Sequence, residues 1–336
     1  MKVAIDQNGN LAYINQDLTN QSFFCPECHQ PLIVKTSKKG RKYFAHYNRK
    51  VNRQGETNEH LTGKSQIYEW AKQNGWHPQL EVSLPLIDQR ADILCQIGTQ
   101  VVAIEFQCSP LSVKTITARN QGYRLSNIQC YWFLGQRYLK HLHTNKIAQF
   151  THWHQNQPVL YFWNINSGNL NIKQINYYNY SWHREKIEIN LLNRYCKNNA
   201  NRRQLANLAY QHGHILCCCP LFAHDINIRL PLLEEEIVEW RISSLLALET
   251  YTVHSWFTLQ QWRQFLIMLG HWNPFPCISR DNFRQMQNNL IQEWTTILQK
   301  QGIIEIHNKK CVIKKKPRWF DTVEQKLAIL NKRLVK

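Results

Sequence analysis

The sequence predicts an α/β protein: a central mixed sheet flanked by helices, with a small β module before it and a mostly helical region after it. Residues 57–178 follow the order helix, three strands, helix, strand, which is typical of a mixed sheet. Residues 1–56 are polar with short β-like runs, and residues 179–336 have helical character interrupted by prolines. We therefore expect three domains with these boundaries.

Periodicity predicts the elements of the central domain. Apolar residues recur near helical spacing from Leu61 to Ala71, which predicts a helix over 59–72 that stops before Gly75. A second helix is expected over 112–127. Alternating or continuous apolar runs predict the strands, and a tight turn at 98–100 joins two of them. The expected strands are 79–84, 91–97, 101–107 and 128–134, followed by a hairpin within 159–175.

Charge and composition narrow the class of protein. The 336 residues include 41 Lys and Arg against 23 Asp and Glu, so the formal net charge is +18, which favours a nucleic-acid partner. The sequence has neither an apolar run of about 18 residues nor a secretory leader, so we expect a cytoplasmic protein without a membrane partner. No phosphate-binding glycine loop occurs, which disfavours nucleotide hydrolysis.

A cysteine pair near the N-terminus indicates a metal half-site. Cys25 and Cys28 lie in a turn between two β-like runs, and His46 ends a third run. Strand, Cys-x-x-Cys turn, strand, loop and strand is the layout of a small zinc ribbon. The basic loop between the last two runs suits phosphate contacts, or it is a solvated turn; its cations include Lys38, Lys39 and Arg41.

Two acids fall within the apolar strands of the central domain. Asp92 opens one expected strand, and Glu105 lies near the end of the next, with Gln107 two residues on and on the same face. Ionised acids are costly in such strands unless they are paired or bind a cation. Together with Mg²⁺ or Mn²⁺ they would suit phosphodiester hydrolysis. Salt bridges to Arg90 or Lys114 are the alternative interpretation.

Several short motifs follow one another in a defined order along the chain. Arg90-Ala91-Asp92 is followed by Ile104-Glu105-Phe106-Gln107-Cys108-Ser109, and Arg119, Tyr123 and Trp132 come after them. Upstream stand Glu59-His60-Leu61-x-x-Lys64 and, earlier, Cys25-Pro26-x-Cys28 with Phe44-Ala45-His46. In this order the motifs resemble the competence protein CoiA family, and the resemblance covers residues 23 to about 175. It implies a restriction-endonuclease-like core of the PD-(D/E)xK type behind a zinc-ribbon-like module.

The resemblance implies roles for the acids and their neighbours. Asp92 and Glu105 would bind Mg²⁺ or Mn²⁺, with the backbone carbonyl of Phe106 as a third ligand. Gln107 stands where many such nucleases have a lysine, and it has no charge, so it could only orient water by hydrogen bonds. Lys64 or Lys114 is a candidate for the missing charge.

Further roles are assigned to residues on the two helices. Glu59 on the first helix would be a third acid of the site, and Glu81 is the alternative candidate for that role. Arg119 and Tyr123 are four residues apart and share a helix face, where Arg119 would contact the substrate phosphate and Tyr123 would orient it or a base. The alternatives are a salt bridge from Arg119 to the site acids and a tyrosine packed in the core. In the N-terminal module, the family's usual first histidine is replaced by Tyr43, so Zn²⁺ would have Cys25, Cys28 and His46 and would need a fourth ligand.

These features lead to three hypotheses. The first is a metal-dependent deoxyribonuclease that processes single-stranded or branched DNA in recombination during natural transformation. The second is a DNA-binding adaptor of weak or no catalytic activity that assists a recombinase or helicase. Gln107, in the position of the usual lysine, would indicate this reduced activity. The third is a nuclease for RNA or for foreign DNA in phage defence, which no sequence feature separates from the first.

Overall fold

The chain divides into two compact units, residues 1–62 and 63–336, which are described separately. The structure is a computed structural model. Among its described helices, none combines the length and apolar character needed to span a membrane. It describes residues 3–7, 11–14, 22–25, 31–37, 40, 42–46, 58–140, 144–175, 200–224 and 230–334.

The first unit contains a small antiparallel sheet. Its order is β2-β1-β3-β4-β5, and its core includes Phe23 and Phe44, whose ring centroids lie 5.0 Å apart. The three predicted runs around the cysteine pair are β3 to β5, while β1 was not anticipated. The strands are β1 Val3–Asp6, β2 Leu11–Tyr13, β3 Phe23–Phe24, β4 Pro31–Thr36 and β5 Lys42–His46.

The second unit contains the predicted mixed sheet. Its order is β10-β11-β9-β8-β7-β6, with β12 paired to β11. β9 runs parallel to β8 and to β11, and the other pairs are antiparallel. The strands are β6 His77–Leu84, β7 Gln89–Ile97, β8 Gln100–Gln107, β9 Ile128–Leu134, β10 His152–His154, β11 Gln157–Asn164 and β12 Asn169–Gln174.

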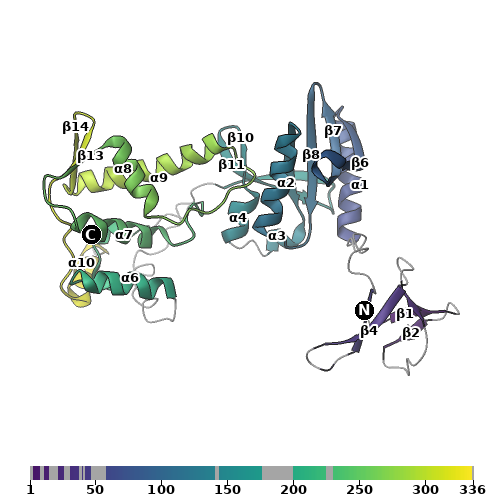
Figure 1. The fold of residues 1–336 in the computed structure, drawn as a ribbon, viewed down its shortest axis with the longest axis horizontal. Helices are drawn as coiled ribbons and strands as arrows, with labels where there is room; N and C mark the ends of the chain where they lie inside the picture. The colour runs from purple at the N-terminus through teal and green to yellow at the C-terminus, as the bar shows by residue number, and fades with distance from the viewer. Residues whose placement is uncertain are drawn as a thin grey trace. The chain divides into compact units, whose positions relative to one another are not determined.

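Two helices cover the sheet at the strands that carry the acids (Figure 1). α1 (Asn58–Gln73) packs Ile67 and Ala71 against the buried side chains of β7 and β8. α2 (Val113–Leu125) packs Tyr123 in a separate cluster, and the Ser112 side chain caps its first turn. The short helices η1 Pro85–Ile87, α3 Gln136–Lys140 and α4 Thr144–Phe150 complete this part.

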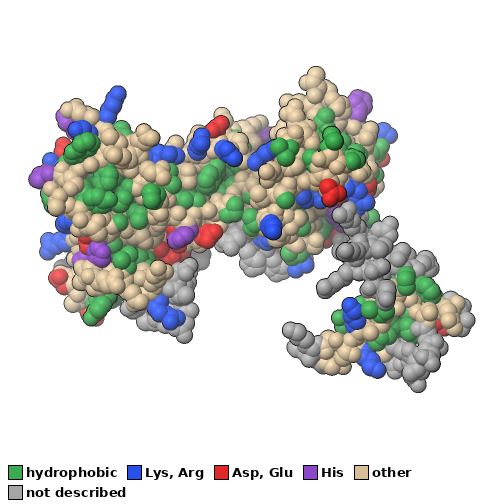
Figure 2. Space-filling view, viewed as in Figure 1, with side chains coloured by type: hydrophobic (Ala, Val, Ile, Leu, Met, Phe, Trp, Pro, Cys, Tyr) green, Lys and Arg blue, Asp and Glu red, His purple; other side chains and the backbone are tan. Residues whose placement is uncertain are grey.

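The C-terminal region is rich in helices, and its apolar core also includes Ala148 of α4. It adds a three-stranded sheet, β13-β15-β14, that the sequence analysis did not anticipate. Lys and Arg side chains are spread over the face of the second unit in Figure 2. The helices are α6 Ala200–Gln211, η2 Leu216–Cys218, η3 Leu221–Ala223, α7 Ile237–Glu249, α8 Leu259–Met268, α9 Arg280–Lys300 and α10 Val323–Leu334; the strands are β13 Trp256–Thr258, β14 Ile304–His307 and β15 Lys310–Ile313.

Candidate active site

The register of β7 and β8 brings the two predicted acids together. Ile93 pairs with Ile104, so the next position on each strand sets Asp92 opposite Glu105. Opposite residues of an antiparallel pair have their Cβ atoms about 4.5–5.5 Å apart on one face of a regular sheet. The nearness predicted from two separate stretches of sequence therefore follows from the hairpin at Gly98, whose φ of +57° suits a glycine.

The side chain of Asp92 takes part in the strand pairing itself. Its Oδ2 accepts a hydrogen bond from the backbone N–H of Phe106, with 3.0 Å between nitrogen and oxygen. This contact extends the β7–β8 pairing beyond Ile93 and Ile104, the last residues paired through the backbone. The carboxylate is thus fixed by the backbone of the strand that carries Glu105.

Glu105 is buried, with 4% of its surface exposed, and α2 supplies its partners. Its Oε1 accepts hydrogen bonds from Nη2 of Arg119 and from the hydroxyl of Tyr123. The same Arg119 nitrogen also donates to the carbonyl of Arg90 at 2.9 Å. The guanidinium carbon lies 5.8 Å from the ring centroid of Trp132. The shared helix face predicted for Arg119 and Tyr123 is therefore the face that meets Glu105.

The electrostatics of the pair suit a divalent cation. Burial raises the pKa of Glu105 to about 7, and the charge of Asp92 adds to the rise, while Arg119 and Tyr123 oppose it. A cation near a carboxylate in this position relieves both the burial and the repulsion. Carboxylate oxygens are hard ligands of the kind that Mg²⁺ and Mn²⁺ prefer, and Mg²⁺ keeps several waters. The two side chains fit such an ion.

A third acid lies on the next strand but has partners of its own. The neighbours of Glu81 on β6 pair with the neighbours of Asp92 on β7, so Glu81 lies opposite Asp92. Glu81 forms ion pairs with Lys64 from α1 and with Nε of Arg90, the latter at 2.7 Å. Its backbone has φ +54°, uncommon for a residue other than glycine. Within the described part of the chain, no group of three or more His, Cys, Asp or Glu is placed to hold one metal ion.

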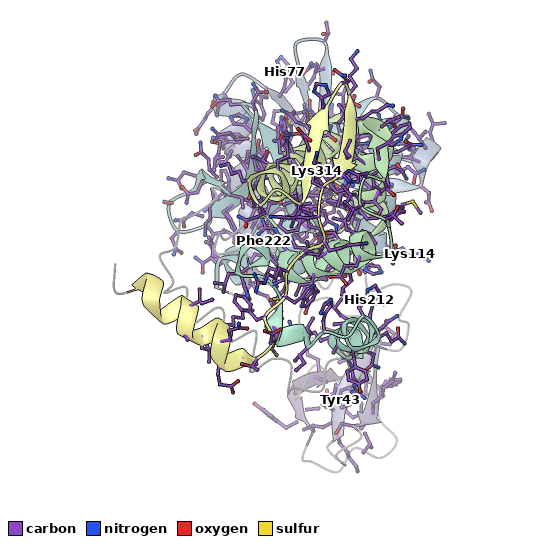
Figure 3. The ribbon with its side chains drawn as sticks, turned by 90° about the vertical axis from the view of Figure 1, so that its left-hand side faces the viewer. Tyr43, His77, Lys114, His212, Phe222 and Lys314 are labelled. Carbon is purple, nitrogen blue, oxygen red and sulfur yellow. The ribbon has the colours of Figure 1, made fainter. Side chains whose placement is uncertain are left out.

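Gln107 contacts the loop that follows its strand. Its amide nitrogen donates to the carbonyl of Ser109 and lies 3.3 Å from the Ser109 hydroxyl oxygen. Lys114, the second candidate for the missing charge, is exposed in the first turn of α2 (Figure 3). Lys64 is 5% exposed and bonded to Glu81. The structure therefore brings Asp92, Glu105, Arg119 and Tyr123 together, and it engages Lys64 and Gln107 with other partners.

The remaining predicted site residues belong to the first unit. Glu59 lies half-exposed in the first turn of α1. Cys25 is buried, and Tyr43 is exposed on β5, where Figure 3 labels it. The His46 backbone ends β5 opposite Leu32. Cys28, Lys38, Lys39 and Arg41 lie outside the described residues. Zinc binding and the basic loop therefore remain predictions.

Sequence reasoning missed two groups near the carboxylates. The thiol of Cys130 on β9 has a pKa raised well above its ordinary value, first by burial and then by the charge of Glu105. Asn120 on α2 accepts a hydrogen bond from the Trp132 indole at 3.3 Å and ties the helix to β9. The alternation of β9 places residues 130 and 132 on one face, so strand periodicity was the signal that could have found Cys130.

Comparisons with known proteins identify the family of the chain. Residues 56–207 match the family model described as the competence protein CoiA nuclease-like domain, and residues 8–51 match the CoiA N-terminal domain. The chain belongs to the CoiA family. It is 33% identical over 129 residues to the competence protein CoiA of Bacillus subtilis (strain 168). That alignment covers 38% of this chain and 35% of the Bacillus protein, and no solved structure matches the chain.

The family assignment applies to defined parts of the chain. The CoiA nuclease-like domain contains the sheet, the two carboxylates and α2, so the candidate site lies wholly inside it. The matched segments end at residue 207. The helices and the small sheet from α7 onward therefore lie outside both matched domains.

Proposed function

We propose that the protein is a metal-dependent deoxyribonuclease that acts in the cytoplasm. Its substrates would be single-stranded or branched DNA that is processed during natural transformation and recombination. The observation that supports this proposal is the pairing of Asp92 and Glu105 across β7 and β8, with Arg119 beside them. The name of the Bacillus relative supports the role in competence.

In this proposal Asp92 and Glu105 hold Mg²⁺ or Mn²⁺, with the Phe106 carbonyl as a further ligand. A bound cation of this kind acidifies water and balances charge on a phosphate oxygen. Arg119 balances the charge of Glu105 in the structure and is 28% exposed at its side chain. Once Glu105 is neutralised in another way, the guanidinium of Arg119 can donate two hydrogen bonds to a phosphate group.

Gln107 and Tyr123 have supporting roles in this proposal. The Gln107 amide, held by Ser109, can orient a water molecule through its oxygen but cannot stabilise negative charge as a lysine would. Burial and the charge of Glu105 raise the pKa of Tyr123, so its hydroxyl keeps its proton and remains a donor. Tyr123 is therefore a positioning residue for Glu105.

A cleavage assay tests this function. The full chain is incubated with single-stranded, duplex and branched DNA in Mg²⁺ or Mn²⁺. Asp92→Asn and Glu105→Gln should each lower the cleavage rate by about 1,000-fold or more, since each removes a negative charge that would hold the metal, and DNA binding should persist. Glu69→Gln is the matched control, because Glu69 is an exposed acid on α1. Equal rates in all variants would point to a contaminating nuclease and refute the proposal.

The adaptor remains the second candidate, and Gln107 favours it. A neutral amide that is bonded to Ser109 supplies no charge to a leaving group. An adaptor would bind DNA without cutting it and would assist a recombinase or helicase. Cells that carry Asp92→Asn would then transform as well as wild-type cells, whereas the nuclease hypothesis requires them to fail.

A further inference from the structure

The C-terminal region contains two successive helices, α8 and α9, followed by a β-hairpin. From α7 onward the order is helix, strand, helix, helix and hairpin, that is α7, β13, α8, α9, then β14 and β15. The hairpin strand β15 lies between β13 and β14, and both pairs are antiparallel. The single strand before α8 therefore joins the hairpin to the two helices in one compact body.

A shared core fixes the helices and the hairpin relative to one another. Trp262 of α8 donates its indole N–H to the Thr295 hydroxyl of α9 at 2.9 Å. Trp294 of α9 and the hairpin residues Ile304 and Cys311 are buried in the same cluster. The two helices and the hairpin are thus held at fixed positions relative to one another.

The exposed face of α9 carries cationic and amide side chains. Buried residues such as Leu290 and Leu298 face the core, and the opposite side of the helix is exposed. Arginine recognises guanine, and asparagine and glutamine recognise adenine, through paired hydrogen bonds in the major groove. Arg280, Asp281 and Lys300 are exposed at the two ends of α9, and the exposed residues between them are Arg284, Gln285, Asn288, Asn289 and Gln292.

The hairpin adds a cationic tip. Asn308 and Lys309 form its two-residue turn, and both have positive φ, as a type I′ turn requires. All four residues from His307 to Lys310 are exposed. The Lys310 ammonium lies 3.8 Å from the ring centroid of the exposed Trp256 on β13, which restricts the lysine without neutralising it. Figure 3 shows Lys314 near the other end of the hairpin.

We propose that this helix–hairpin surface binds duplex DNA. The surface consists of the five exposed α9 residues named above and of His307, Asn308, Lys309 and Lys310. The N-terminal half of α9 would enter the major groove of the DNA, which is about 12 Å wide, while the hairpin tip contacts the neighbouring DNA backbone. This function goes beyond phosphodiester cleavage, because it assigns duplex recognition to a region outside both matched CoiA domains.

The side chains favour duplex over single-stranded DNA. Single strands are bound largely by stacking bases on exposed aromatic rings. The five α9 residues include no aromatic ring. Trp256, beside the hairpin, is 52% exposed, and the Lys310 ammonium lies over its ring. One acid borders the helix face: Oδ1 of Asp281 lies 3.6 Å from Nη1 of Arg284. The charge and hydrogen-bonding capacity of the α9 side chains suit the grooves and phosphates of a double helix.

Fluorescence anisotropy with the full chain in EDTA tests the proposal without any cleavage. The probes are a labelled 20-base-pair duplex and the matching single strand. Arg284→Ala, Lys309→Ala and Lys310→Ala combined should weaken duplex binding at least tenfold and lower the slope of log affinity against log salt by about 2 to 3. Gln285→Ala with Gln292→Ala should leave the slope unchanged and reduce the preference among duplex sequences.

A control variant removes the same charge elsewhere on the second unit. Lys72→Ala, Lys173→Ala and Arg203→Ala change three exposed cations that lie outside the helix–hairpin surface. This variant should change duplex affinity less than twofold. Equal losses in both triple variants, or no loss in the first, would overturn the proposal, and so would a larger effect on the single strand. Neither result bears on Asp92 and Glu105, so the nuclease function is tested separately.

Discussion

Buried charges have different partners in the two parts of the second unit. In the nuclease-like domain, Glu105 is bonded by the side chains of Arg119 and Tyr123 at the point where Asp92 bonds the neighbouring strand. In the C-terminal region, the buried cations Lys326 and Arg241 bond backbone carbonyls as well as side chains; the side-chain partners are His224 and Cys219 for Lys326 and Glu293 for Arg241. Lys326 donates to the Cys217 carbonyl at 2.8 Å, and Arg241 to the His224 carbonyl at 2.9 Å.

The difference separates a site from a scaffold. A carbonyl is part of the chain and cannot leave its cation without local unfolding, so Lys326 and Arg241 hold segments together. The side-chain partners of Glu105 can change rotamer, and the Arg119 side chain is 28% exposed. Buried charge alone therefore does not identify a functional site.

Removing the buried lysine should have the largest effect on stability. Lys326→Met keeps the length of the side chain and leaves the Cys217 carbonyl and Nε2 of His224 without their donor. We expect the free energy of unfolding to fall by about 3 kcal/mol, which urea denaturation measures. Glu105→Gln is the comparison: because burial raises the pKa of Glu105 to about 7, its charge lowers stability at pH 8, so the neutral amide should not lower the free energy of unfolding. The reverse order would break the distinction between site and scaffold.

Substitutions at two helical glycines test how tightly α1 and α2 pack against the strands that carry the carboxylates. A Cβ at Gly63 would lie 2.1 Å from the ring of Phe106, which is 1% exposed, so Gly63→Ala should lower stability by about 2 kcal/mol. A Cβ at Gly122 would meet the flexible end of Gln89, so Gly122→Ala should be nearly neutral. Thermal unfolding measures both. Restoration of stability by adding Phe106→Leu to Gly63→Ala would identify the ring contact as the cause, and its absence would contradict it.

Acid should weaken both parts through a buried histidine in each. Burial lowers the pKa of His152 to about 3, and burial, followed by the charges of Lys326 and Arg241, does the same for His224. Each imidazole is neutral in the folded state but binds a proton below about pH 6.5 when unfolded. Stability is therefore full above pH 6.5 and falls as the pH drops toward 3, by about 2 kcal/mol per histidine at pH 5.

His152→Gln keeps an acceptor for the Trp132 backbone N–H, which donates to Nε2 of His152 at 3.1 Å. Urea denaturation at pH 7.5 and pH 5 should show a smaller acid loss in this variant than in the wild type. His154→Gln is the control, because His154 is only half-buried on the same strand. An unchanged acid loss in His152→Gln would assign the pH dependence to other groups.

Much of the fold was readable from the sequence. The continuous apolar run of β9 was predicted with the bounds the structure has, 128–134. The hairpin of β14 and β15 was missed because its strands are four residues long and its Asn308-Lys309 turn lacks the glycine that usually marks such a turn. At the site, strand order predicted the nearness of Asp92 and Glu105. The ion pairs of Glu81 could not be predicted, since its left-handed backbone has no signature in a glutamate.

The hydrogen bond from the Phe106 amide to Asp92 affects how the site can be dissected by mutagenesis. Asp92 supplies a charge and also closes a gap in the main-chain ladder. An alanine there would delete both at once and leave the Phe106 nitrogen without its acceptor, so lost activity would be confounded with a frayed strand. Asparagine retains an oxygen for that nitrogen and changes only the charge, which makes the amide the informative substitution at this position.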